Sequence, residues 1–124
     1  MAKSKKFDEW MADYLKFRSK AAVLLSKPIS SEVGQLQKES QDLEPLAWEA
    51  EEHRAFAESH YYQAKSEGAE QLAKEGWPKS SVYEAAKAKS FRQIWARENT
   101  AGLCKVITSR SMKVAQHLKL LDGR

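Results

Sequence analysis

Large apolar residues recur at alternating steps of three and four near the start of this chain, and this spacing constrains the fold most strongly. Because an α-helix makes one turn in about 3.6 residues, side chains spaced in this way share one face. The pattern predicts an amphipathic helix over residues 4–26, ending where Pro28 disfavours helical geometry at Lys27. The residues that define the face are Phe7, Trp10, Tyr14, Phe17, Ala21 and Leu24.

The remainder of the chain shows no strand pattern. Its β-branched residues are few and never alternate, whereas Ala, Leu, Glu, Lys and Gln are abundant. A length of 124 residues suits one domain. We therefore expect a single all-α, bundle-like domain over residues 1–124: an N-terminal amphipathic helix (1–27), a connector with a short second helix (28–44) and a long antiparallel helical hairpin (45–124).

Local signals place the ends of the hairpin helices. Pro45 suits the first turn of a helix, and Gly76-Trp77-Pro78 ends that helix after residue 75. Ser81 and Glu84 have the spacing of a capping box, which predicts the start of the last helix. A bend is expected at residues 98–102, where Asn, Thr and Gly interrupt the apolar pattern.

Small residues line the inner positions of the predicted 45–75 helix. Such a surface allows a neighbouring helix to approach closely, as in closely packed coiled coils. We therefore expect the last helix to pack tightly against it. The small residues are Ala47, Ala50, Ala57, Ala64 and Gly68.

Charge is distributed unevenly along the chain. Residues 45–77 hold seven acidic and three basic residues, whereas residues 78–124 hold three acidic and ten basic residues. An acidic helix beside a basic one favours the antiparallel pairing, and intramolecular attraction alone explains most of the asymmetry.

Two sets of residues in the sequence contain groups that can act in metal binding or catalysis. Glu49, Glu52, His53 and His60 lie on successive turns, but neither the Glu-x-x-His pairs of di-iron bundles nor a His-Glu-x-x-His zinc motif is present. Cys104 sits among apolar residues, where a thiol is usually packed and not reactive. We expect no catalytic residue, no metal site, no cofactor and no small-molecule substrate.

The expected location is the cytoplasm. No apolar run approaches the roughly 20 residues that cross a bilayer, and the charged start leads into Phe7 instead of an apolar signal segment. One cysteine permits no internal disulfide. We expect no membrane association.

The basic C-terminal third suggests contact with nucleic acid. Cations neutralise phosphates and aromatic rings stack on bases in proteins that bind single strands. The alternative is that the aromatic residues belong to the core and the cations pair with the acidic helix. The candidate contacts are Lys105, Arg110, Lys113 and Lys119 for phosphates, and Phe91 and Trp95 for bases.

The number of large aromatic residues suggests a second interface. A two-helix hairpin has too small a cross-section to bury all of them, so some are expected to contact a partner chain, either another copy or a helical protein. The alternative is that the N-terminal helix covers them within one monomer. The predicted interface residues are Phe7, Trp10, Tyr14, Phe17 and Leu24.

From residue 43 to residue 119, the chain combines an Ala/Glu-rich helix, a Gly-Trp-Pro turn and an Ala/Lys-rich helix. In this it resembles small helical-hairpin proteins encoded in bacteriophage genomes. The resemblance implies a non-enzymatic accessory protein near replication, recombination or host takeover.

The leading prediction is a non-enzymatic, self-associating interaction or scaffolding protein. The alternative is a nucleic-acid-binding accessory factor in replication or recombination that uses the basic C-terminal helix.

Overall fold

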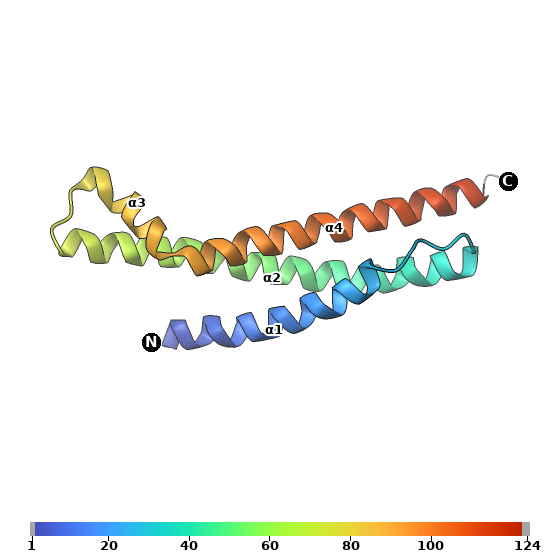
Figure 1. Ribbon diagram of the computed structural model, residues 1–124, viewed down its shortest axis with the longest axis horizontal. Coiled ribbons are helices and arrows are strands. Elements are labelled where there is room, and N and C mark those ends of the chain that lie inside the picture. The colour runs from blue at the N-terminus through green and yellow to red at the C-terminus, as the bar shows by residue number, and fades with distance from the viewer. Residues whose placement is uncertain (1, 123–124) are drawn as a thin grey trace.

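The computed structural model describes the backbone of residues 2–122 and the side chains of residues 6–122. Within this range the chain forms four helices and no strand: α1 (Ala2–Leu25), α2 (Val33–Lys74), α3 (Lys79–Lys89) and α4 (Phe91–Asp122). Helices α2 and α4 run antiparallel as a long hairpin, and α1 packs along the middle of both (Figure 1). The prediction of an all-α, bundle-like fold is confirmed.

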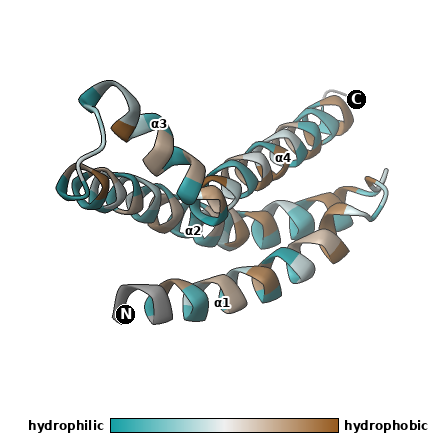
Figure 2. Cartoon of the chain, turned by 60° about the vertical axis from the view of Figure 1, so that its left-hand side comes forward, coloured by the Kyte–Doolittle hydropathy of each residue, from teal (hydrophilic) through white to brown (hydrophobic). Residues whose placement is uncertain are grey.

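Helix α1 forms as the apolar spacing predicted. Five residues of the predicted face, Phe7, Trp10, Tyr14, Phe17 and Ala21, are buried. Apolar and polar bands alternate along this helix in Figure 2. It ends in a tight turn in which the amide of Lys27 donates to the carbonyl of Leu24 across 3.3 Å, just before Pro28.

The predicted division at Pro45 is wrong, because α2 continues through this residue. Proline inside a helix removes one backbone hydrogen bond and costs about 3 kcal/mol. Here the cost is offset by burial on both sides of the proline, since Leu36 and Leu43 join Leu46 in one core cluster. The expected short second helix is therefore the first part of α2.

The predicted capping box at Ser81 is also wrong. Helix α3 begins two residues earlier, at Lys79, with Pro78 in the capping position and no side-chain cap. The amide of Ser81 donates to the carbonyl of Pro78 across 3.0 Å, so it already lies inside the first turn. The φ angle of Pro78 is fixed near its helical value, and proline has no backbone N–H that would need an acceptor. It can therefore start the helix without a capping side chain.

The chain turns at Ser90, between α3 and α4, whereas α4 continues unbroken through residues 98–102, where an interruption was predicted. Within that stretch the Thr100 hydroxyl donates to the carbonyl of Ala96 across 2.8 Å, and Thr100 is fully buried. Tertiary packing thus overrides the weak helix propensity of these residues. At the turn between α3 and α4, the buried Ser90 hydroxyl donates to the carbonyl of Ala86 across 2.9 Å.

Two clusters make up the core of the described residues. The larger lies where α1, α2 and α4 meet, and its fully buried members include Leu36, Ile107 and Val114. The smaller lies between α2 and α3. There a Cβ atom added at Gly68 would stand 3.2 Å from the Cβ of Ala86. The small residues of α2 therefore allow close packing as expected, and the helices that pack against α2 are α3 as well as α4.

Candidate interaction surface

The residues predicted to contact a partner chain face the interior of the monomer. Phe7, Trp10, Tyr14 and Phe17 are at most 9% exposed, and Leu24 is partly buried against the same cluster. The covering of the hairpin by α1, which the sequence left as the alternative, is what the structure shows. While α1 stays packed, these side chains form no surface for a second chain, so that assignment is corrected.

Aromatic rings hold α1 against α2. The indole of Trp10 stacks on Tyr14 and Phe56, with ring centroids 5.3 and 5.0 Å apart. Its Nε1 donates to Nδ1 of His53 across 3.0 Å. Burial lowers the pKa of His53, against the opposing effect of Glu49 and other nearby carboxylates. His53 therefore serves as a neutral hydrogen-bond acceptor in the core.

The buried hydroxyl of Tyr14 and the buried thiol of Cys104 lie in the core. The Tyr14 hydroxyl donates to Oδ1 of Asn99, and burial raises the pKa of Tyr14 to about 12. Burial also raises the pKa of the Cys104 thiol to about 11, with Glu51 adding to the effect. No group of three or more potential metal ligands occurs in the part of the chain that the structure describes.

The candidate phosphate contacts divide into two kinds. Arg110 is committed inside the protein: Nε and Nη2 donate to the two Glu39 carboxylate oxygens across 2.7 and 2.8 Å, and Nη1 donates to the carbonyl of Lys27 across 2.6 Å. Its assignment as a surface contact is therefore corrected. Lys105, Lys113 and Lys119 are exposed.

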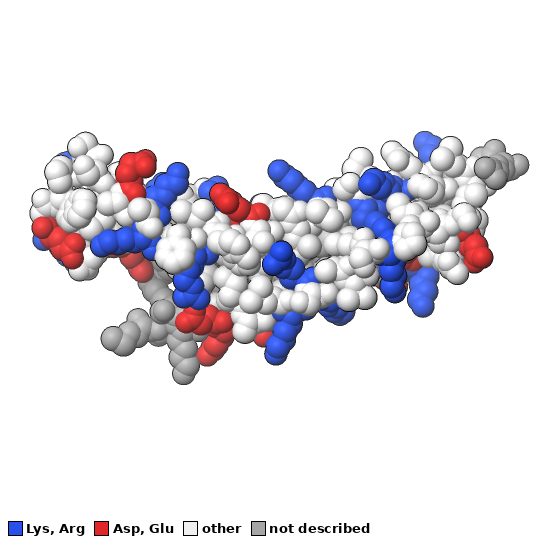
Figure 3. Space-filling model, viewed as in Figure 1, with Lys and Arg blue, Asp and Glu red and all other residues white. Residues whose placement is uncertain are grey.

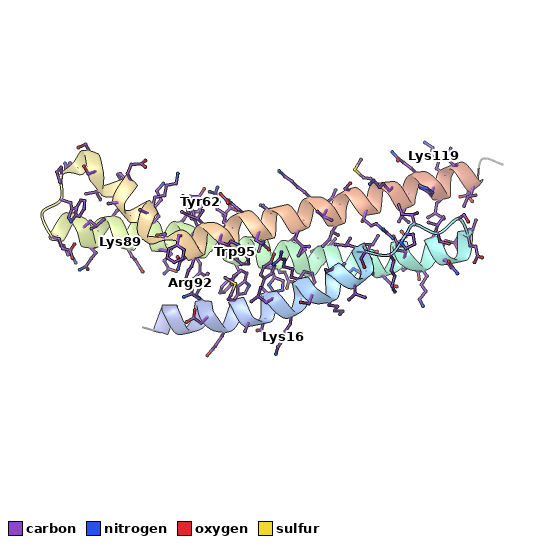
Figure 4. The ribbon with its side chains drawn as sticks, in the orientation of Figure 1. Lys16, Tyr62, Lys89, Arg92, Trp95 and Lys119 are labelled. Carbon is purple, nitrogen blue, oxygen red and sulfur yellow. The ribbon has the colours of Figure 1, made fainter. Side chains whose placement is uncertain are left out.

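Four exposed apolar residues lie on the outer side of α4 and are here called the α4 stripe. Phe91, Trp95, Val106 and Leu120 are 69%, 41%, 51% and 70% exposed. They follow one another after 4, 11 and 14 residues, close to whole numbers of helical turns. Basic side chains lie beside uncharged surface on this side of the molecule (Figure 3), and Trp95 and Lys119 are labelled in Figure 4. The predicted base contacts Phe91 and Trp95 thus belong to an accessible surface.

A groove of about 430 Å³ runs beside the α4 stripe, between α1 and α4. Trp95, Leu103 and Val106 provide its apolar lining, and the Arg18 guanidinium lies 6.0 Å from the centre of the Trp95 ring. A Cβ added at Gly102, which also lines the groove, would meet no atom within 4 Å. The groove is therefore open to solvent at Gly102, where α4 carries no side chain.

A second exposed surface, on α2, was missed by the sequence reasoning. Trp48 is 70% exposed, and the exposed residues Glu44 and Glu52 lie one turn to either side of it. These three residues are here called the α2 face. Their signal was available, since Trp48 falls on the opposite side of the helix from the apolar positions Leu43, Leu46 and Ala50.

Comparisons with protein-family models, with curated proteins and with solved structures each find no match. Among the described residues, no helix is both long and apolar enough to span a bilayer.

Proposed function

We propose that this protein is a non-enzymatic helical interaction protein, and that it binds its partner through the α4 stripe. The observation that carries the proposal is the exposure of Phe91, Trp95, Val106 and Leu120 along one face of one helix. Single apolar residues are normal on a surface, but several large ones on the same side of one helix, here with exposed lysines between them, are typical of an interface. Tryptophan is also among the residues that contribute most to binding at interfaces.

The chemistry of the interior supports binding over catalysis. His53 accepts a hydrogen bond from Trp10, and the Tyr14 hydroxyl donates to Asn99. The Cys104 thiol has a pKa raised to about 11, far from the range of a nucleophile that is active at neutral pH. These three groups are accounted for by the packing of the bundle.

A photo-crosslinking side chain placed at Val106 tests the proposal. In living cells it should form adducts with a second chain, because Val106 lies at the centre of the stripe. The matched control is the same group at Lys16, which is exposed on α1 and points away from α4 (Figure 4). Adducts formed equally from both positions, or from neither, would contradict the assignment of the α4 stripe as the interface.

The alternative function, a nucleic-acid-binding accessory factor, is favoured by one observation. The exposed rings of Phe91 and Trp95 share α4 with the exposed cations Lys105, Lys113 and Lys119. Exposed rings together with exposed cations are the combination that binds single strands. A role in replication or recombination, a bacteriophage origin and a cytoplasmic location stay predictions.

Fluorescence anisotropy of labelled single-stranded oligonucleotides at low and high salt tests this alternative. Each phosphate contact that is removed should lower the slope of log K against log salt by about 0.7. The combined variant Lys105→Gln, Lys113→Gln, Lys119→Gln should therefore flatten the slope, whereas the control Lys16→Gln, Lys20→Gln should not. Absence of binding at low salt, or equal slopes for the two variants, would rule this function out.

A further inference from the structure

The two exposed surfaces of the hairpin are complementary in charge. Helix α4 holds six basic and two acidic residues, whereas α2 holds nine acidic and four basic residues. Lys105 and Lys119 lie beside the α4 stripe and Lys113 lies between Val106 and Leu120, whereas the α2 face places Trp48 between Glu44 and Glu52. We propose that the α4 stripe of one copy binds the α2 face of a second copy of this chain. The inference rests on the proposed function and identifies its partner.

Ion pairs inside the monomer leave this complementarity available. Helix α2 is joined to α4 by Glu39 with Arg110 at 2.7 Å and by Glu58 with Arg97 at 3.9 Å. Glu44 and Glu52 take no part in these pairs and are exposed, as are the three lysines beside the stripe. The acidic and basic helices are therefore only partly neutralised by their contact within one chain.

Apolar shape supports the same pairing. Trp48 projects from the α2 face with 70% of its surface exposed, and the α4 stripe borders the open groove at Gly102. The groove has a volume of about 430 Å³, an apolar lining of Trp95, Leu103 and Val106, and a polar lining of Arg18, Glu98 and Asn99. The Trp48 indole of the second copy is the side chain that we place in this groove. Burying it there removes a large apolar area from water on both copies.

Charge also determines which surfaces of two copies can face each other. Two α4 stripes facing each other would bring lysines together, and two α2 faces would bring glutamates together, so both symmetric pairings are disfavoured. The favoured contact joins two different surfaces. Each copy carries one of each, so the contact either closes reciprocally in a two-fold dimer or repeats in a ring or filament.

A charge-swap experiment tests this contact by sedimentation velocity over a range of protein concentrations. The wild-type protein should associate as its concentration rises and dissociate as salt rises. The α4 variant Lys105→Glu, Lys113→Glu should be monomeric alone, and so should the α2 variant Glu44→Lys, Glu52→Lys. An equimolar mixture should assemble again, because each variant then presents the charge that the other lacks. The control Lys16→Glu, Lys20→Glu makes the same change in net charge on α1 and should assemble like the wild type.

Other results would overturn the inference, provided that circular dichroism shows each variant to be helical. They are a wild-type protein that stays monomeric at every concentration, variants that assemble alone, or a mixture that stays monomeric.

The variant Trp48→Ser gives an independent measure and should weaken assembly at least tenfold. If Val106 crosslinks to a different protein or the stripe binds oligonucleotides while the wild type stays monomeric, the second copy is rejected as partner. Crosslinks from Val106 to a different protein would leave the proposed function standing, whereas absence of crosslinks together with monomeric behaviour would reject both.

Discussion

The indole Nε1 of Trp10 on α1 donates a hydrogen bond to Nδ1 of His53 on α2 across 3.0 Å. An indole N–H can only donate, so Nδ1 must be unprotonated to accept it. The contact joins two residues that are 43 positions apart in the chain and fixes α1 against the hairpin. It also makes the docking of α1 sensitive to protonation of one histidine.

The bundle should lose stability as pH falls below about 6.5, the ordinary pKa of an unfolded histidine. Burial lowers the pKa of His53 in the folded state. The unfolded chain therefore binds more protons than the folded one in this range, and the free energy of unfolding rises with pH.

Denaturant unfolding between about pH 5.5 and pH 7.5 measures the effect. His53→Gln should reduce this pH dependence and cost about 1–3 kcal/mol at the higher pH, whereas His117→Gln, on the exposed side of α4, should keep the dependence. An unchanged pH profile in His53→Gln would contradict the assignment.

Arg110 should contribute far more to stability than other arginines on the surface. Its side chain and that of Glu39 are 10% and 17% exposed and share two hydrogen bonds. Arg110→Ala leaves the carboxylate of Glu39 without its partner, so we expect a loss of about 1.5–3 kcal/mol in the free energy of unfolding. Arg110→Lys should recover only part of it, because an ammonium group cannot form the paired contact. The control Arg54→Ala removes an exposed pair with Glu51 and should change little. Equal effects for the two alanine variants would argue against this role.

Two glycines in helices should respond differently to alanine. Gly102 has open space at its Cβ position, so Gly102→Ala should raise stability by about 0.5–1 kcal/mol through helix propensity alone. At Gly68 the added methyl group would meet Ala86 Cβ at 3.2 Å, so Gly68→Ala should gain less or lose stability. Thermal unfolding of both variants gives the comparison. A larger gain at Gly68 would show that α3 packs less closely than the structure indicates.

The Cys104 thiol should react slowly with alkylating and disulfide reagents near neutral pH. The thiolate is the reactive form, and a pKa of about 11 leaves very little of it. Labelling should become fast once denaturant exposes the thiol and restores its ordinary pKa. Labelling of the native protein at the rate of the denatured one would show that Cys104 is neither buried nor perturbed.

Local periodicity alone is enough to predict the all-α class and the inner face of α1. Phe7, Trp10, Tyr14 and Phe17 share a face in any helix, whatever covers that face. The same spacing could not tell whether the cover is a partner or the chain itself. Tertiary structure decided this in favour of the hairpin, through contacts such as Trp10 with His53.

Local signals for helix ends were reliable only where packing agreed with them. Pro45 and residues 98–102 read as interruptions, yet burial of Leu36, Leu43 and Thr100 keeps both helices continuous. Propensity differences of up to about 1 kcal/mol per residue, and even the larger cost of a proline, are small beside the burial of several large side chains.

For the candidate surface, the sequence indicated the basic helix but not which of its cations are exposed and which form ion pairs inside the protein. Arg110 and Lys113 have similar surroundings along the chain, but Arg110 meets Glu39 from 71 residues away, whereas Lys113 faces solvent. Trp48 and Trp10 are likewise both tryptophans on amphipathic helices, and one is 70% exposed while the other is 9% exposed. Composition and periodicity set which side chains a helix can present. Contacts between distant segments decide which of them are used inside the fold and which remain for a partner.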